Sequence, residues 1–197
     1  MKFIIATVAT ALLAATPAFA ADDSGFYVGA GIGEFGLELD HSDLIRFDGS
    51  DTAFKVLGGY QLMKYFAFEL EYIDAGEAED IWRGEYEGYS VKVTNTIGLS
   101  GFNASAVGIL PLGEKFSVFG KVGVIYWDAD LKEKVYYEEF DNTDSFKDSD
   151  SGNDFSWGVG AAFDFTDHVG VRVEYQGFEI EDVDTADLIS GSVVWKF

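Results

Sequence analysis

The chain of 197 residues has a formal net charge of −22, no cysteine, 23 glycines and a 16% content of aromatic residues. This length predicts one domain, the acidity argues against nucleic-acid binding, and the lack of cysteine excludes disulfides and a lipid-modified cysteine. No later segment approaches the roughly 20 consecutive apolar residues of a membrane-spanning helix.

The first 20 residues predict a secretory signal peptide. Lys2 precedes the apolar run Phe3–Ala15, and Ala18-Phe19-Ala20 has the small residues of a cleavage site. The apolar run is short for an uncleaved membrane anchor. We therefore expect residues 21–197 to form the exported, mature domain.

The mature chain predicts an all-β domain, because apolar residues alternate with small or polar ones in successive segments. The predicted strands are Gly25–Gly33, Thr52–Leu62, Tyr65–Ile73, one strand within Val91–Leu110, Phe116–Trp127, Phe155–Phe165, Val169–Gln176 and a last strand from about Ile189 to Phe197. Long polar connections alternate with very short turns. This order predicts an eight-stranded antiparallel up-and-down barrel, with long loops at one end and tight turns at the other.

Two kinds of barrel fit this alternation: a soluble, lipocalin-like barrel with an apolar interior, and a transmembrane barrel with an apolar exterior. The polar face is rich in glycine, alanine and serine, which suits a narrow lumen. The apolar face carries aromatic residues near the strand ends, which suits two membrane interfaces. These are Phe26, Tyr60, Phe66, Phe116, Phe165 and Trp195 on the short-turn side, and Tyr72, Tyr126, Phe155 and Tyr175 on the other. The pattern favours the transmembrane barrel.

Charged residues within the strands lie on the predicted lumenal face, and their charges nearly cancel. They are Lys55, Glu69, Glu71, Lys121, Asp164, Arg172 and Glu174. Buried charges require partners, so we expect a paired network that closes the lumen. The alternative is that these groups gate a small pore.

Several segments together resemble the OmpA-like outer-membrane barrel family: GFYVGAGIG, PLGEKFSVFGKVGVIYW, WGVGAAFDFTDHVGVRVEYQ and the terminal SVVWKF. The resemblance implies an eight-stranded barrel in the outer membrane of a Gram-negative bacterium, in contact with membrane lipids and lipopolysaccharide. It also implies that Trp195 and Phe197 belong to a terminal signal read by the barrel-assembly machinery. One departure from the family's terminal signal is that its usual glycine is expected at position 192, where this chain has Ser192, and Gly191 stands one position earlier. We expect no peptidoglycan-binding domain after the last strand, so the resemblance does not imply tethering to the cell wall.

Nearly all of the net charge falls in four long connections, which hold 27 acidic and 5 basic residues: Glu34–Asp51, Asp74–Tyr89, Asp128–Asp154 and Glu179–Asp187. We expect them to be extracellular loops. Their charge serves solvation, or captures divalent cations that bridge to lipopolysaccharide phosphates. Within DSDSGND, Asp148, Asp150 and Asp154 resemble half of an EF-hand loop, but glycine falls one position early and no glutamate closes it.

Catalysis has little support in the sequence. The two histidines, His41 and His168, lie in the first long connection and in a short turn, and neither forms a recognisable nucleophile–base set. We predict no catalytic residue and no cofactor. The function predicted is that of a monomeric outer-membrane barrel with an envelope-structural or surface-interaction role. The alternatives are a small, weak diffusion channel and a lipid-active outer-membrane enzyme.

Overall fold

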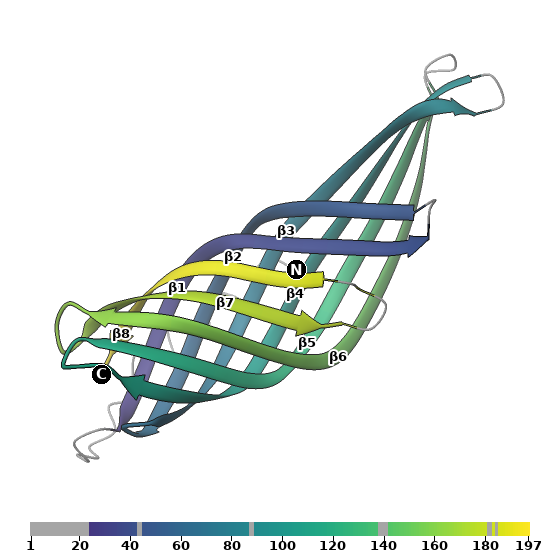
Figure 1. Cartoon of the computed structure of the whole chain (residues 1–197). Helices are drawn as coiled ribbons and strands as arrows, with labels where there is room; N and C mark the ends of the chain where they lie inside the picture. Colours follow the sequence, from purple (N-terminus) through teal and green to yellow (C-terminus); the bar gives the residue numbers. More distant parts are fainter. Residues whose placement is uncertain (1–23, 43–44, 87–88, 138–141, 181–182, 184) are drawn as a thin grey trace.

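The structure, a computed structural model, describes residues 24–42, 45–86, 89–137, 142–180, 183 and 185–197 (Figure 1). Eight antiparallel strands follow one another around a closed barrel, and the last strand pairs with the first. They are β1 (Gly25–Ser42), β2 (Ile45–Met63), β3 (Phe66–Tyr86), β4 (Tyr89–Pro111), β5 (Phe116–Tyr137), β6 (Asn142–Asp164), β7 (Val169–Glu179) and β8 (Thr185–Lys196). The predicted barrel is confirmed. The predicted signal peptide lies outside the described residues.

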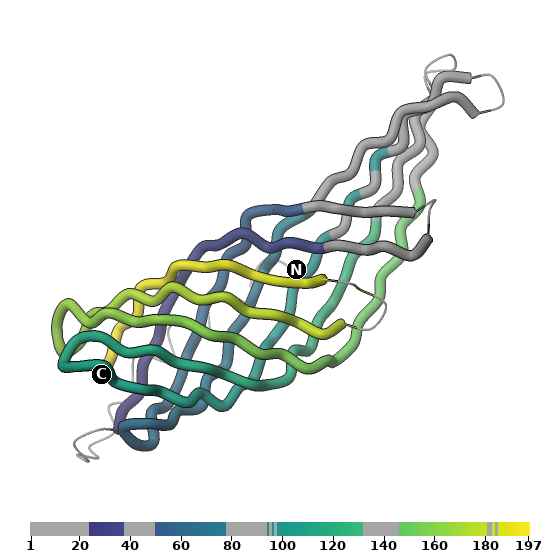
Figure 2. The backbone as a smooth tube through the Cα atoms, in the orientation of Figure 1, coloured from purple at the N-terminus to yellow at the C-terminus, as the bar shows by residue number. Residues whose placement is uncertain are grey.

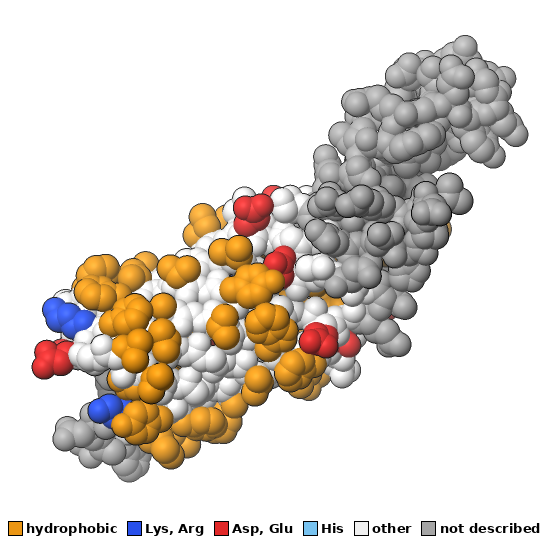
Figure 3. Space-filling model, viewed as in Figure 1, with side chains coloured by type: hydrophobic (Ala, Val, Ile, Leu, Met, Phe, Trp, Pro, Cys, Tyr) orange, Lys and Arg blue, Asp and Glu red, His pale blue; other side chains and the backbone are white. Residues whose placement is uncertain are grey.

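Side chains alternate between the lumen and the outer surface, as a period of two requires. In β2, Phe54 and Val56 are 60% and 58% exposed, whereas Lys55 and Leu57 are each 2% exposed. Apolar side chains gather over the barrel wall in the view of Figure 3. Within the described residues, no helix is long and apolar enough to cross a membrane.

Aromatic rings contact one another on the outer surface at two levels of the barrel. The ring centroids of Phe26 and Tyr60 are 4.6 Å apart on the short-turn side. Those of Tyr72 and Phe102 are 5.0 Å apart, nearer the opposite end of the strands. Aromatic belts at two levels with an apolar band between them characterise a transmembrane barrel.

The end of the chain is fastened at the short-turn end of the barrel (Figure 2). The backbone N–H of Lys196 donates to the carbonyl of His168 at 2.8 Å, and that of Phe197 donates to the carbonyl of Phe26 at 3.0 Å. Trp195 and Phe197 lie on the outer surface, where they are 49% and 50% exposed. These hydrogen bonds hold the last strand against its neighbours at this end.

Six strands are longer than a membrane requires. β7 and β8 have 11 and 12 residues, close to the roughly 9–11 of a membrane-spanning strand. β6 has 23 residues; it pairs with β7 only from Phe155 to Asp164, but with β5 from Asn142 to Phe163. β3 to β6 therefore continue beyond the barrel as a four-stranded sheet, which we call the extended sheet.

The long strands change the interpretation of three polar stretches. Glu34–Asp51, Asp74–Tyr89 and Asp128–Asp154 are predicted to be loops, but their described residues lie in strands β1 to β6. The physical reason is that backbone hydrogen bonds between neighbouring strands hold a long hairpin whatever its polarity. Strands outside a membrane can therefore form without the alternation of apolar residues by which strands are predicted.

The sheet divides where β3 leaves β2. Pairing between the two strands reaches Phe54 and Asp74, and β3 resumes its pairing with β4 at Glu77 after a register shift. Gly76 has a φ of 74°, in the left-handed region that favours glycine. The Asp51 carboxylate accepts a hydrogen bond from the backbone N–H of Glu77 at 2.9 Å, so β2 remains attached to β3 at the division.

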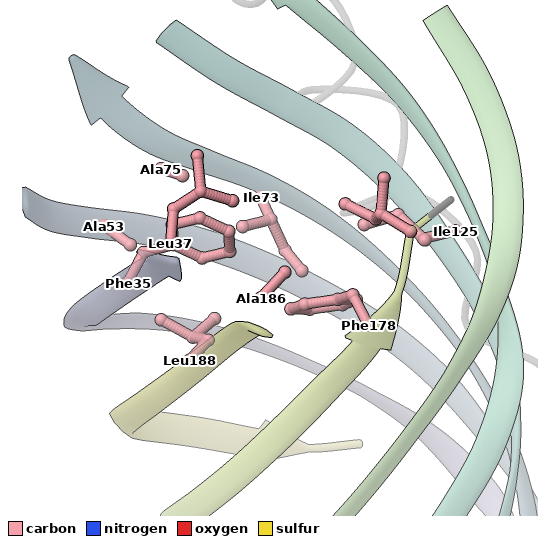
Figure 4. Packing of buried hydrophobic residues seen from close by; sticks show 10 residues of the cluster. Phe35, Leu37, Ala53, Ile73, Ala75, Ile125, Phe178, Ala186 and Leu188 are labelled. Carbon is pink, nitrogen blue, oxygen red and sulfur yellow. The ribbon is translucent and has the colours of Figure 1, made fainter. Parts of the chain in front are cut away.

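The lumen is filled in three layers. A turn-side apolar layer consists of Tyr27, Leu57, Ala67, Val107, Phe119 and Val194. A far apolar layer, shown in Figure 4, consists of Phe35, Leu37, Ala53, Ile73, Ala75, Ile125, Phe178, Ile180, Ala186 and Leu188. Between them lies a charged layer, as successive inward positions of β3 show: Ala67 is followed by Glu69 and Glu71, and then by Ile73.

Candidate functional site

The charged layer contains six ionisable side chains that reach inward from β2, β3, β5 and β7. They are Lys55, Glu69, Glu71, Lys121, Arg172 and Glu174, and none is more than 8% exposed. Three bases and three acids make the set neutral when all are ionised. Alternate residues of one strand share a face, so Glu69 reaches the lumen together with Glu71, and Arg172 together with Glu174.

Two lysines and two glutamates form a closed ring of alternating charge. The Nζ atom of Lys55 lies 3.3 Å from Glu71 Oε1 and 2.5 Å from Glu174 Oε2. On the other side of the ring, Lys121 Nζ lies 2.6 Å from Glu71 Oε2 and 2.5 Å from Glu174 Oε1. Each charge of the ring therefore has an opposite charge on both sides.

Arg172 and Glu69 form the second part of the charged layer. Arg172 Nη1 lies 2.6 Å from Glu69 Oε2, and the guanidinium stacks over the ring of Phe119 at 4.1 Å from its centroid. The hydroxyl of Tyr27 donates to the same carboxylate oxygen at 2.8 Å. Glu69 Oε1 is also 3.6 Å from Lys121 Nζ, which links this pair to the ring.

Three neutral side chains complete the network, and they are not among the lumenal residues predicted from the sequence. Asn103 Nδ2 and Gln176 Nε2 donate to Glu71 Oε2 at 3.0 and 2.9 Å, and Gln176 Oε1 accepts from Lys55 Nζ at 3.1 Å. Ser156 Oγ donates to Asn103 Oδ1 at 2.7 Å. All three occupy inward positions of their strands, which is the signal that could have found them.

The layer joins strands that are far apart in the chain. Glu69 on β3 and Arg172 on β7 are separated by 103 positions, and Lys55 on β2 and Glu174 on β7 by 119. A buried charge without a partner is costly, whereas here every cation has a carboxylate oxygen within 2.6 Å. The arrangement can therefore hold the barrel closed and occupy its cross-section.

Asp164 differs from its prediction as a member of this network. Its Oδ2 atom lies 2.6 Å from Lys196 Nζ, and the two side chains are 27% and 40% exposed. Asp164 pairs with Gly170, two positions nearer the short turn than the pairing of Ala162 with Arg172. The strand period thus gave the correct face for Asp164 but not its depth in the lumen.

The candidate calcium ligands make other hydrogen bonds. Asp148 and Asp150 accept from the backbone N–H of the residue that follows each of them, at 2.9 and 2.8 Å. Asp154 Oδ2 accepts from Trp127 Nε1 at 2.6 Å. In the part of the chain that the structure describes, no three histidine, aspartate or glutamate side chains are grouped to hold a metal ion. The calcium hypothesis receives no support from this geometry.

His168 has a structural position in the turn between β6 and β7. Its ring stacks on that of Trp195, with centroids 5.8 Å apart and planes 13° from parallel. Its Nδ1 atom lies 3.0 Å from the backbone carbonyl oxygen of Lys196. These contacts tie the turn to the end of β8. The side chain of His41 lies outside the described residues.

The apolar exterior, the aromatic belts and the charge-paired lumen together identify a small outer-membrane barrel. Residues 6–197 match the family described as "Outer membrane protein beta-barrel domain". The chain belongs to this family. The barrel therefore lies in the outer membrane, as the sequence predicts.

Curated relatives agree with this assignment. The chain is 27% identical to outer membrane protein A of Salmonella typhi over 180 residues, which are 88% of this chain and 46% of that protein. It is 28% identical to outer membrane protein A of Shigella flexneri over 122 residues, which are 60% of this chain and 30% of that protein. The chain thus spans less than half the length of these relatives.

Solved structures share the fold. Ail, the attachment invasion locus protein of Yersinia pestis, has a TM-score of 0.56 at 13% identity and covers 90% of this chain and 100% of its own. Neisserial surface protein A has a TM-score of 0.55 at 16% identity, with coverages of 89% and 100%. OprG of Pseudomonas aeruginosa has a TM-score of 0.52 at 13% identity, with coverages of 88% and 93%. A structure of Ail with the heparin analogue sucrose octasulfate has a TM-score of 0.53 at 14% identity, with coverages of 88% and 99%.

Proposed function

We propose that this outer-membrane barrel has a closed lumen and serves envelope structure and surface interaction rather than solute passage. The observation that supports the proposal is the three-layer filling of the lumen. Leu57 and Val107 in the turn-side apolar layer are 2% and 1% exposed, and Leu188 in the far apolar layer is fully buried. An ion would have to cross two apolar layers and a layer of paired charges.

The charged layer also lacks the excess of one sign of charge that is expected along an ion path. Its six charges balance, and the ring formed by Lys55, Glu71, Lys121 and Glu174 satisfies both signs. A diffusion channel of this narrow type would require the Arg172–Glu69 pair to separate and the apolar side chains around it to move. Such a rearrangement exposes unpaired charges in a low-dielectric lumen, which costs about 3–5 kcal/mol.

Single-channel recording in planar bilayers tests the proposal. The folded full chain is expected to give no sustained conductance over the range of voltages at which the bilayer is stable. A Leu57→Ser, Val107→Ser double variant removes apolar bulk from the turn-side layer and serves as a comparison. A steady, ion-selective current through the unmodified protein would overturn the closed-lumen proposal and favour the channel.

The proposal includes a non-enzymatic role. The ionisable groups of the charged layer are engaged with one another, and His168 is engaged in a turn. The curated relatives carry the name outer membrane protein A. Mass analysis of lipid A from cells with and without this protein should therefore show the same species. A species that depends on the protein would point to a lipid-active enzyme.

In this proposal the extended sheet faces the exterior and carries the surface-interaction role. Its described side chains from Phe146 to Ser151 are exposed, and the two acidic stretches that contribute to it, Asp74–Tyr89 and Asp128–Asp154, hold 16 acidic and 4 basic residues. Ail has been crystallised with a polyanion, sucrose octasulfate. The acidity of this chain opposes binding of a polyanion and favours a cationic partner, or divalent ions that bridge to lipopolysaccharide phosphates.

The lipopolysaccharide arm of the proposal has a direct test. In bilayers that contain lipopolysaccharide, removal of divalent cations with EDTA should lower the unfolding temperature, because acidic side chains and phosphates then repel one another. In phosphatidylcholine bilayers the same treatment should have no effect. An equal response in both bilayers, or in neither, would count against cation bridging.

A further inference from the structure

A cavity of about 450 Å³ opens at the short-turn end of the lumen. Its closed end is formed by Tyr27, Phe119 and Arg172, and its wall includes Val107 and Ile109. Its mouth lies among the short turns between strands. We call this cavity the turn-side vestibule. It is separate from the acidic end of the protein, because the charged layer and the far apolar layer lie between them.

Among the described residues that line the vestibule, bases outnumber acids, although the chain as a whole is strongly acidic. The whole sequence has 13 lysines and arginines against 35 aspartates and glutamates. Among the described residues that line the vestibule the balance is reversed, with four bases and two acids: Lys64, Lys115, Arg172 and Lys196 against Glu114 and Asp164. Glu69 neutralises Arg172 and Asp164 neutralises Lys196, so the positive charge that favours an anion is that of Lys64 and Lys115 beside Glu114.

Two of the four bases are already paired. Arg172 pairs with Glu69 and Lys196 pairs with Asp164, each at 2.6 Å. Lys64 and Lys115 lie in the short turns at the mouth and are exposed. The ammonium of Lys64 lies 5.8 Å from the ring centroid of Tyr65. These two lysines are therefore the groups best placed to meet an incoming anion.

The wall of the vestibule supplies the second half of a binding site. Val107 is 1% exposed and Phe119 is 6% exposed, and both face the cavity together with the half-buried Ile109. Small-molecule sites are commonly concave and mostly apolar, with a few polar groups that fix orientation, and about 300–1,000 Å³ in volume. An apolar wall behind a basic mouth matches a molecule that has an apolar body and one anionic head.

We propose that the turn-side vestibule binds a small amphiphilic carboxylate, with its carboxylate between Lys64 and Lys115 and its apolar body against Val107, Ile109 and Phe119. The proposal goes beyond the closed-lumen function and does not depend on it. A bilayer lipid is the alternative occupant, and the phosphatidylglycerol comparison below tests it. The proposed ligand reaches the site from the aqueous side of the short turns.

Methyl-resolved NMR of the folded full chain in phosphatidylcholine nanodiscs tests the proposal with hexanoate as the probe. The methyl signals of Val107 and Ile109 should shift saturably with hexanoate. Acetate lacks the apolar body and 1-hexanol lacks the charge, so both should bind at least about tenfold more weakly. These comparisons separate a site that needs both features from simple charge attraction or simple partitioning.

Matched variants identify the residues. Lys64→Gln with Lys115→Gln should weaken hexanoate binding about tenfold, since two charge-assisted contacts are lost. Lys147→Gln, on the exposed far part of β6, should leave it unchanged. Heat-dependent migration on detergent gels checks that each variant is folded; exposed turn positions should tolerate the change.

Three results would overturn the proposal: no saturable shift with hexanoate, equal loss in the Lys147→Gln control, or unchanged binding in the double lysine variant. A fourth concerns lipid. If phosphatidylglycerol in place of phosphatidylcholine shifts the vestibule methyls while hexanoate does not, the basic mouth binds lipid headgroups and the carboxylate assignment is wrong.

Discussion

Replacement of Lys121 by methionine tests whether the charged layer stabilises the barrel. Lys121 is 3% exposed, and its Nζ atom lies 2.6 Å from Glu71, 2.5 Å from Glu174 and 3.6 Å from Glu69. Methionine preserves most of the volume of the side chain, so the change removes the charge without leaving a large cavity. Three buried carboxylates would then share two cations.

The expected loss follows from the three contacts. Removing one partner of a buried ion pair costs about 3–5 kcal/mol, because the remaining charge is left without compensation. Lys121 serves three carboxylates, and any water that enters the lumen lowers the cost. We expect a loss of about 3–4 kcal/mol in the free energy of unfolding. The matched control Lys147→Met, at an exposed position of β6, should change it by less than about 0.5 kcal/mol.

Urea unfolding in lipid vesicles, followed by the fluorescence of the four tryptophans, measures the difference. A second change, Glu71→Gln, restores the balance of charge in the Lys121→Met background. The double variant should recover part of the loss, with a coupling energy of about 1–3 kcal/mol in the cycle. Neither variant should conduct ions, because both apolar layers remain.

Two outcomes would refute the reasoning. The first is a Lys121→Met protein as stable as the Lys147→Met control, which would mean that the ion pairs contribute no net stability. The second is a stable Lys121→Met protein with new single-channel current, which would show that the charged layer is a gate. Additive losses in the double variant would mean that Lys121 and Glu71 do not interact energetically.

Three further predictions follow from the wall and the ends of the barrel. Val173→Arg, at an outward position that is 63% exposed, should lower the free energy of unfolding in urea by about 2–4 kcal/mol. Val171→Arg should lower it by less, because Val171 lies nearer the short-turn interface. Equal losses would refute the depth assignment. Deletion of Phe197 should reduce folded protein in cellular outer membranes without reducing export, if the terminal aromatic residues are read by the barrel-assembly machinery; wild-type amounts of folded protein would refute this. Gly76→Ala should cost about 1–3 kcal/mol because of its positive φ, whereas Gly58→Ala, where an added Cβ meets open space, should cost less; the same urea assay compares them.

The faces of the strands could be predicted from the sequence, but depth within the barrel could not. The period of two placed Lys55, Glu69, Lys121 and Arg172 in the lumen, where the structure has them. It also placed Asp164 there, but this residue pairs with Lys196 near the short turns. Depth depends on how far each strand is shifted along its neighbour, and no single strand carries that information.

The ends of the strands also could not be predicted from the sequence. In the membrane, apolar alternation marks a strand because lipid requires it. Beyond the membrane this requirement disappears, so the charged segment Asp128–Tyr137 resembles a loop although it belongs to β5. The far apolar layer escaped prediction for a related reason. Phe178 lies near the end of β7, next to an acidic stretch. Only closure of the barrel through β1 and β8 brings Phe35 to Leu188 and to the ring of Phe178, whose centroid is 6.2 Å away.

The charged layer itself contributes to the choice of register. A shift of one residue between strands would turn apolar side chains into the lumen, and the membrane alone opposes that. A shift of two residues would keep every face correct and would satisfy the membrane equally well. It would, however, move Glu69 and Glu71 of β3 to the level of an apolar layer and leave Arg172 without its partner. We infer that the buried ion pairs select one stagger among those that the apolar pattern permits, which is the role of register specification that buried polar groups perform elsewhere.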